Sequence, residues 1–140
     1  MPKSYTELYY HFIWATKNRE PFIMPGFEDR LYRYIVSRCS EYGYKCFKVN
    51  GIENHVHAVL RLPPTVSVAE AMQRLKGSSS HFVNNEIIPE FRFVWQTGYG
   101  ALTFARRDLK AVVNYVAAQK DRHRDNNLNP LLESCGEDED

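Results

Sequence analysis

Hydrophobic residues in the first part of the chain follow two successive patterns, and each pattern predicts one secondary-structure element. Residues 5–16 are dominated by aromatic and β-branched side chains with polar ones interspersed, which is typical of a strand. From Phe27 to Tyr42 the apolar residues recur at steps of three and four, the stripe of an amphipathic helix. Gly43 follows, and a glycine in this position commonly ends a helix. We therefore predict a strand followed by a helix.

The middle of the chain predicts a hairpin and a second helix. Residues 44–52 and 55–62 favour two strands joined by a short polar link, which makes an antiparallel pair. Ser67 and Glu70 have the spacing of a capping box, in which each side chain bonds the backbone of the other residue. The apolar face that follows predicts a helix over residues 67–86.

The last part predicts two short strands, over residues 91–96 and 99–105, and a third helix. Asp108 can cap that helix, and its apolar stripe runs from Leu109 to Val116. The order of elements predicts an α+β fold, a ferredoxin-like split βαβ antiparallel sheet with helices packed on it. The third helix is expected to be a C-terminal addition to that sheet.

Composition supports one compact domain. The 140 residues are 44% hydrophobic and 14% aromatic, enough for one sizeable core, and no tract is compositionally biased. The three cysteines are odd in number and lack the C-x-x-C spacing of structural zinc sites, so we expect free thiols. No apolar run reaches the roughly 20 residues that a membrane span needs. We expect a cytoplasmic protein without membrane association.

The charge is unevenly distributed, although the net charge is only +1. Five of the 17 acidic residues lie in the last eight positions, which leaves 18 basic against 12 acidic side chains in residues 1–132, a net charge of +6. We interpret residues 1–132 as the single domain and residues 133–140 as an acidic tail that is expected to be disordered. A moderately basic body is compatible with a nucleic-acid partner, but many cytosolic enzymes have a similar balance.

His55 and His57 are the strongest local signal for chemistry. Residues two apart on a strand point to the same side, so both imidazoles project together and can hold a metal ion. Two structural histidines would give the same pattern. The chain has neither the H-E-x-x-H motif of metalloproteases nor a phosphate-binding or dinucleotide-binding glycine loop. We therefore expect no nucleotide cofactor.

Tyr115 and Gln119 lie four residues apart on the third predicted helix. This spacing separates them by about 40° around the helix axis, so their side chains share one face and can reach one site. The alternative is that Tyr115 covers the edge of the core and Gln119 is solvated. The spacing alone does not separate these interpretations.

Five segments together resemble the motifs of one family, and they occur in that family's order across residues 9–123. They are HFIWATKNR (11–19), GIENHVH (51–57), KGSS (76–79), WQTGY (95–99) and NYVAAQ (114–119). On these segments the chain resembles the single-tyrosine HUH transposases of bacterial insertion sequences. This is the IS200-like family, which includes relatives acting at repetitive extragenic palindromes. Relatives often have two histidines beyond the glutamine, where this chain has Arg122 and His123.

The resemblance implies an activity and a set of site residues. His55, His57 and Gln119 would be ligands of a divalent ion, Mg²⁺ or Mn²⁺, and Tyr115 would be the nucleophile. The implied reaction cuts and rejoins single-stranded DNA near hairpins through a 5′-phosphotyrosine, without ATP. The resemblance also implies a homodimer in which the tyrosine helix of one subunit can complete the site of the other.

Basic and small polar side chains near the motifs are candidates for phosphate contacts, and solvated surface residues are the alternative. These candidates are Lys17, Arg19, Lys76, Ser78, Arg106, Lys110, Arg107, Arg122 and Arg124. Three other functions remain open at this point: a domesticated protein that binds DNA hairpins without cutting, an RNA-binding ferredoxin-like module, and a metal-dependent phosphoesterase that uses water. The retained Tyr115 and histidines disfavour the first, and no RNA-binding strand signature supports the second.

Overall fold

The computed structural model describes residues 4–136 and forms four strands and four α-helices in that range. In chain order they are β1 (Tyr9–Ala15), α1 (Glu28–Tyr42), β2 (Lys45–Ile52), β3 (His55–Arg61), α2 (Val68–Phe82), β4 (Gly100–Phe104), α3 (Leu109–Ala117) and α4 (Gln119–Arg124). A short 3-10 helix, η4 (Pro130–Glu133), follows α4. None of the helices in the described range has the length and apolar character that membrane crossing requires.

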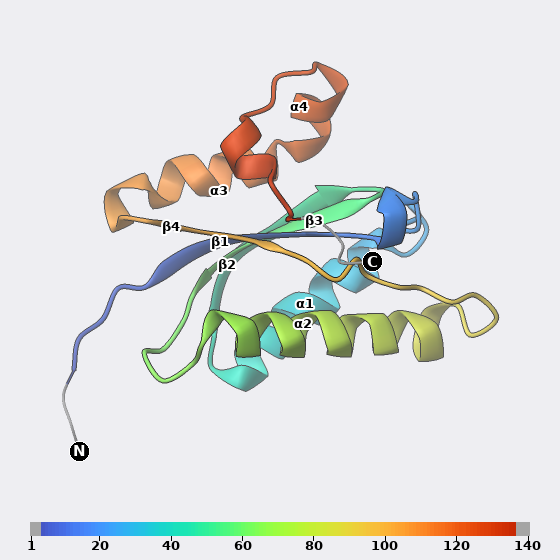
Figure 1. The fold of residues 1–140 in the computed structure, drawn as a ribbon, viewed down its shortest axis with the longest axis horizontal. Coiled ribbons are helices and arrows are strands. Elements are labelled where there is room, and N and C mark those ends of the chain that lie inside the picture. Colours follow the sequence, from blue (N-terminus) through green and yellow to red (C-terminus); the bar gives the residue numbers. More distant parts are fainter. Residues whose placement is uncertain (1–3, 137–140) are drawn as a thin grey trace.

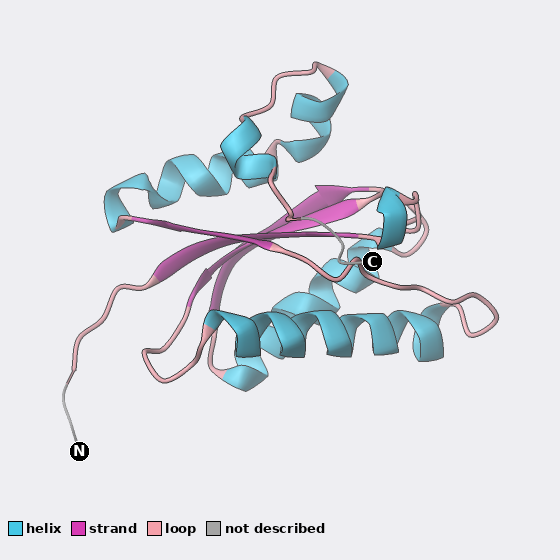
Figure 2. Cartoon of the chain, in the orientation of Figure 1, coloured by secondary structure: helices cyan, strands magenta, loops and turns pink. Residues whose placement is uncertain are grey.

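The strands form one antiparallel sheet in the order β2-β3-β1-β4. β3 lies between β1 and β2, the two strands that α1 connects, and this is the split βαβ arrangement. α1 and α2 cover one face of the sheet, whereas α3, α4 and η4 lie over the other face (Figures 1 and 2). The predicted α+β fold with a ferredoxin-like antiparallel sheet is confirmed.

Strand β1 is buried on both faces, because helices lie on each side of the sheet. Phe12 and Trp14 are fully buried in the core that the sheet forms with α1 and α2. Successive strand residues point to opposite faces, so His11 and Ile13 point to the layer of α3 and η4. A fully buried histidine in this position needs a polar partner, which β3 supplies.

Two local signals in the sequence have the predicted structural roles. Gly43 has a positive φ of 81° and ends α1, with its N–H donating to the carbonyls of Cys39 and Ser40. At the start of α2, the Ser67 hydroxyl accepts a 3.0 Å hydrogen bond from the Glu70 backbone N–H. Both signals act within a few residues, so the sequence alone is sufficient to place them.

The predicted strand over residues 91–96 is wrong. Only Trp95 makes a β-bridge, to Thr16. The backbone of Phe93 is instead paired with the Asn84 side chain, which donates to its carbonyl at 2.9 Å and accepts from its N–H at 2.6 Å. Phe93 and Trp95 are buried against the core, and this explains the apolar pattern without a strand.

The third helix is not continuous, which corrects the predicted single helix. α3 ends at Ala117, Ala118 has φ −96° and ψ 17°, and α4 begins at Gln119. The Asn50 amide from β2 donates to the carbonyls of Val116 and Ala117, each at 3.1 Å. A side chain thus bonds the last carbonyls of α3 and stabilises the break.

Candidate active site

The two strand histidines lie side by side on the face that α3 covers. His55 is 3% exposed and His57 is fully buried. His57 Nδ1 is 2.8 Å from His11 Nε2, and His55 Nδ1 is 2.8 Å from Asn54 Oδ1. These bonds fix the orientation of both rings and leave both Nε2 atoms for the site, as is common for histidines that bind metals.

Tyr115 lies against the same histidines, in the same chain. Val112 and Val116 of α3 pack with Val59 of β3, and this contact holds the helix on the sheet. The Tyr115 ring centroid is 6.2 Å from that of His57. Its hydroxyl accepts a 3.1 Å hydrogen bond from the Asn129 backbone N–H. The tyrosine as a whole is 5% exposed, so most of its ring is packed against the rest of the chain.

Gln119 reaches the site from the first position of α4 and is fully buried. Its Oε1 is 3.3 Å from His55 Nε2 and 3.0 Å from His123 Nε2. The interpretation of Gln119 as a solvated residue is therefore wrong. The break at Ala118 places Tyr115 and Gln119 on two helices, and both side chains still meet at the histidines.

Glu133 is a site residue that sequence reasoning missed. The sequence pattern places it in the acidic tail, but it lies in η4, and its Oε1 is 3.3 Å from both His55 Nε2 and His57 Nε2. Its Oε2 accepts hydrogen bonds from the Gln119 amide, at 3.1 Å, and from the Tyr115 hydroxyl. The tail boundary at residue 133 needs correction for this reason. Residues 137–140, which we expected to be disordered, lie outside the described residues.

His123 also belongs to the cluster, although its neighbour Arg122 differs from the usual motif. His123 Nε2 is 3.4 Å from Glu133 Oε1. The Arg122 guanidinium stacks on the Tyr115 ring, 4.4 Å from its centroid, and donates to the Asn127 carbonyl. The arginine thus covers the outer side of the tyrosine in place of a second histidine.

Burial determines the charge of the cluster. Desolvation lowers the pKa of His57 and lowers that of His11 to about 3, so both imidazoles are neutral at pH 7. Desolvation and the hydrogen bond to Glu133 raise the pKa of Tyr115 to about 12. Burial would also raise the pKa of Glu133, but its close contacts with the His55 and His57 imidazoles hold it well below its ordinary value. The cluster therefore contains an ionised carboxylate beside neutral imidazoles, which suits a cation.

The donor atoms fit a divalent metal ion. One ligand atom from each of His55, His57 and Glu133 lies within 4.8 Å of the other two. His57 Nε2 is buried and has no hydrogen-bond partner among the described residues, although it faces Glu133. In the tautomer in which His57 Nδ1 donates to His11, this nitrogen has a free lone pair, and imidazole with carboxylate suits ions such as Mn²⁺.

The chain matches a known family from its first strand to Gln119. The sequence model described as "Transposase IS200 like" matches residues 4–119, most of the chain. The protein belongs to the IS200-like transposase family. Among curated proteins, no sequence matches it.

Two solved structures share the fold of this family member. A candidate transposase from Deinococcus radiodurans R1 has a TM-score of 0.67 at 23% identity, covering 85% of this chain and 98% of its own. A REP-associated tyrosine transposase bound to a REP hairpin has a TM-score of 0.64 at 14% identity, covering 88% of this chain and 73% of its own. At sequence identities this low, the structural similarity shows that the chains share a fold.

Several cations that we expected to contact DNA in this family member already have partners within the chain. Lys76 Nζ donates to the carbonyls of Gln96, Thr97 and Gly98 at 2.7, 2.9 and 3.1 Å. This bonding holds the loop before β4 to α2. Arg106 pairs with Glu7 at 3.3 Å. Their roles toward DNA stay predictions.

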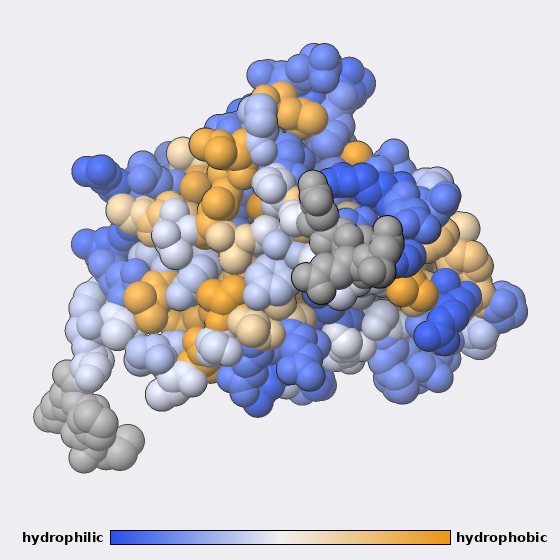
Figure 3. Space-filling model, viewed as in Figure 1, coloured by the Kyte–Doolittle hydropathy of each residue, from blue (hydrophilic) through white to orange (hydrophobic). Residues whose placement is uncertain are grey.

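The other candidates are dispersed over the surface. Arg19, Arg107, Lys110 and Arg124 are exposed, whereas Lys17 and Ser78 are half-buried. Arg124 pairs with two aspartates of its own helix region. Hydrophilic side chains dominate the surface over α4, and hydrophobic ones gather below α3 and across β4 (Figure 3).

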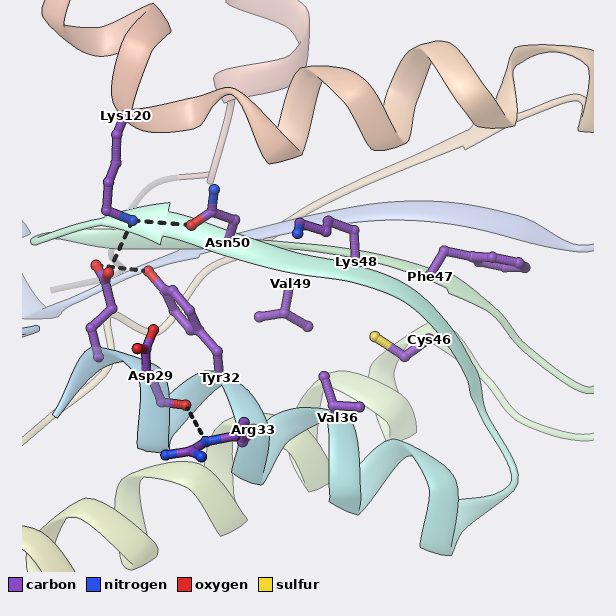
Figure 4. A pocket seen from close by; sticks show the side chains of 11 residues that line it. Asp29, Tyr32, Arg33, Val36, Cys46, Phe47, Lys48, Val49, Asn50 and Lys120 are labelled. Atoms are coloured by element: carbon purple, nitrogen blue, oxygen red, sulfur yellow. Dashed lines mark hydrogen bonds and ion pairs between the residues drawn. The ribbon is translucent and has the colours of Figure 1, made fainter.

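A cavity of about 610 Å³ lies between α1 and the edge strand β2, and no residue of the histidine cluster lines it (Figure 4). Residues of α1 and β2 line it, and Lys120 of α4 reaches over it. Lys120 Nζ contacts Asn50 Oδ1 at 3.1 Å and Glu28 Oε1 at 2.9 Å. These contacts fasten α4 to β2 and to α1, and they fix the helix that carries Gln119.

Proposed function

We propose that this transposase-family protein cuts and rejoins single-stranded DNA beside hairpins through a covalent bond to Tyr115. One observation carries the proposal: the Tyr115 hydroxyl shares a buried cluster with His55 and His57 of the same chain. A tyrosine beside two oriented imidazoles has the groups that phosphodiester exchange needs. The REP hairpin bound to the structural neighbour supports a hairpin substrate.

The metal ligands in this proposal come from two strand residues and one helix residue. His55, His57 and Gln119 would hold a divalent ion, Mg²⁺ or Mn²⁺. When bound there, the ion would polarise the scissile phosphate and stabilise the charge of its transition state. His11 and Asn54 hold the two rings in place from behind.

In the proposed reaction, the Tyr115 oxygen attacks phosphorus in line with the departing 3′ oxygen. The phenol loses its proton and its oxygen bonds to phosphorus, while the bond to the 3′ oxygen breaks and that oxygen takes up a proton to become a 3′-OH, so the step is proton-neutral overall. Attack by another 3′-OH reverses these steps and joins new strands. One phosphodiester replaces another of similar energy, so no ATP is required.

The direct test is capture of a covalent adduct. Labelled single-stranded hairpin libraries are incubated with the protein and Mn²⁺, separated on a denaturing gel, and the attached DNA is sequenced. We expect one 5′ attachment site at a fixed distance from a hairpin. Binding without an adduct would instead identify a hairpin-binding protein, and cleavage without an adduct would identify a phosphoesterase that uses water.

A mixing experiment tests whether one chain supplies a whole site. Tyr115 and His57 meet within the chain described here, so a mixture of Tyr115→Phe and His57→Ala proteins is expected to remain inactive. No subunit in the mixture has both groups. Recovery of adduct to roughly half the parental level would show that the tyrosine helix of one subunit completes the site of the other. That result would contradict a site formed within one chain.

The homodimer stays a prediction. Joining two DNA ends needs two nucleophiles, and one chain has a single tyrosine in the histidine cluster within its described residues. Two-fold symmetry is the commonest way to supply a second one. Light scattering at working concentration measures the assembly, and a monomer with full strand-transfer activity would contradict the prediction.

A further inference from the structure

The segment after α4 returns the chain to the cluster and is firmly anchored. Asn129 caps η4, with its side chain accepting from the Leu131 N–H at 3.1 Å. Cys135 is buried against Ile13 and Ala15 of β1. Glu133 lies between these two anchors, so its place in the cluster follows from packing on both sides.

Gly100 of β4 adds a third anchor. A Cβ at this position would lie 1.8 Å from the Ser134 carbonyl oxygen, so only glycine admits the segment this close to the strand. The backbone next to Glu133 therefore packs directly against the edge strand β4. This close packing restricts where the Glu133 side chain can lie.

The distances around Glu133 are those between donors of one metal ion. Bonds of about 2.0–2.2 Å to nitrogen or oxygen place neighbouring donors roughly 3 Å apart. Glu133 Oε1 is 3.3 Å from the Nε2 atoms of both His55 and His57. Three donors with these spacings can share one ion after small shifts.

The charge balance also points to Glu133. Two imidazoles and the amide of Gln119 bring no negative charge to a divalent cation. Mg²⁺ and Mn²⁺ prefer anionic oxygen ligands, and Glu133 is the carboxylate that the structure places against both imidazoles. The family match ends at residue 119, so this carboxylate lies outside the matched region.

We propose that Glu133 is a carboxylate ligand of the divalent ion, together with His55 and His57. This inference rests on the proposed function, since it concerns the same ion. It adds a ligand that the tyrosine and histidine motifs do not contain. In this arrangement Gln119 donates to Glu133 through its Nε2 and has Oε1 beside His55.

Calorimetric titration with Mn²⁺ tests the inference without any DNA. We expect Glu133→Ala to weaken Mn²⁺ binding by about 100-fold and Glu133→Gln by about 10-fold or more, because the neutral amide retains an oxygen donor without the charge. Leu131→Ala is the matched control, because Leu131 lies on the same short helix and is 74% exposed. We expect that control to bind as the parent does.

Gly100→Ala is a second variant that changes no donor atom. The added methyl collides with the Ser134 carbonyl, so the segment must shift and carry Glu133 with it. We expect weaker Mn²⁺ binding here as well, with a normal circular dichroism spectrum. Parental affinity in Glu133→Ala would overturn the inference, whatever Gly100→Ala shows.

Other outcomes separate this inference from the proposed function. Tighter Mn²⁺ binding by Glu133→Ala would overturn it and show that the carboxylate merely fills the place of the ion. Whatever Glu133→Ala shows, His57→Ala is expected to lose Mn²⁺ binding if the proposed metal site is right. If the parent protein binds no Mn²⁺ at all, the proposed function loses its metal and the inference fails with it.

Discussion

A Tyr115→Phe variant is expected to form no covalent DNA adduct, a loss of more than about 10³-fold, with hairpin affinity within about twofold of the parent. Only the nucleophilic oxygen is removed. The ring keeps its packing with Val112 and Val116 and its contact with Arg122. Adduct yield on a denaturing gel and hairpin binding by fluorescence anisotropy measure the two quantities separately.

The control for this variant is Tyr34→Phe, the same chemical change on the opposite layer. Tyr34 stacks on Phe82 with ring centroids 4.1 Å apart, and its ring lies on α1 away from the histidines. We expect it to form adduct at the parental rate. Equal adduct from Tyr115→Phe would refute the assignment of the nucleophile.

His57→Ala is expected to abolish both Mn²⁺ binding and cleavage. The substitution removes a buried nitrogen that faces the cluster, and no other side chain in the described range can take its place on β3. It also leaves His11 without its 2.8 Å partner and opens a cavity, so the melting temperature should fall by several degrees. Calorimetry with Mn²⁺ and a thermal melt separate these effects.

His81→Ala is the histidine control, because His81 is exposed on α2, on the other side of the sheet. We expect parental Mn²⁺ binding and cleavage from it. Mn²⁺ binding by His57→Ala as tight as that of the parent would show that the strand histidines are structural.

Most of the fold is readable from local sequence signals. The end of α1 at Gly43 and the start of α2 at Ser67 depend on neighbours in the chain, so pattern and spacing suffice. The error at residues 91–96 has a different origin. Phe93 and Trp95 are apolar because they pack on the core, and the partner of the Phe93 backbone is a side chain nine residues away. A hydrogen bond between a backbone and a distant side chain leaves no periodic pattern of hydrophobic residues in the sequence.

The sequence predicted those members of the candidate site that belong to short motifs, the two strand histidines and the tyrosine–glutamine pair. His55, His57, Tyr115 and Gln119 come together in the structure as a cluster. Glu133 was not predictable, because an acidic residue near an acidic run usually indicates a solvated tail. Asn129-Pro130 is a cap signal that could have indicated order there.

His11 is the other member that the sequence did not reveal. It lies on the first strand, and its bond to His57 depends on the register that pairs Ile13 with His57. Register between strands distant in sequence is a tertiary property, and one residue of slip would turn His11 to the other face.

The burial of the tyrosine has a kinetic consequence. In the proposed reaction, a phosphodiester could reach the Tyr115 hydroxyl only after Asn129 and Glu133, which contact that hydroxyl, have moved aside. The observed rate of adduct formation then equals the rate of the chemical step multiplied by the fraction of molecules that are open. Each 1.4 kcal/mol of opening free energy slows turnover tenfold, about the effect of one lost hydrogen bond to a charged group. Under the proposed function, the rate of adduct formation would therefore depend on local opening of the segment that carries Asn129 and Glu133, in addition to hairpin affinity.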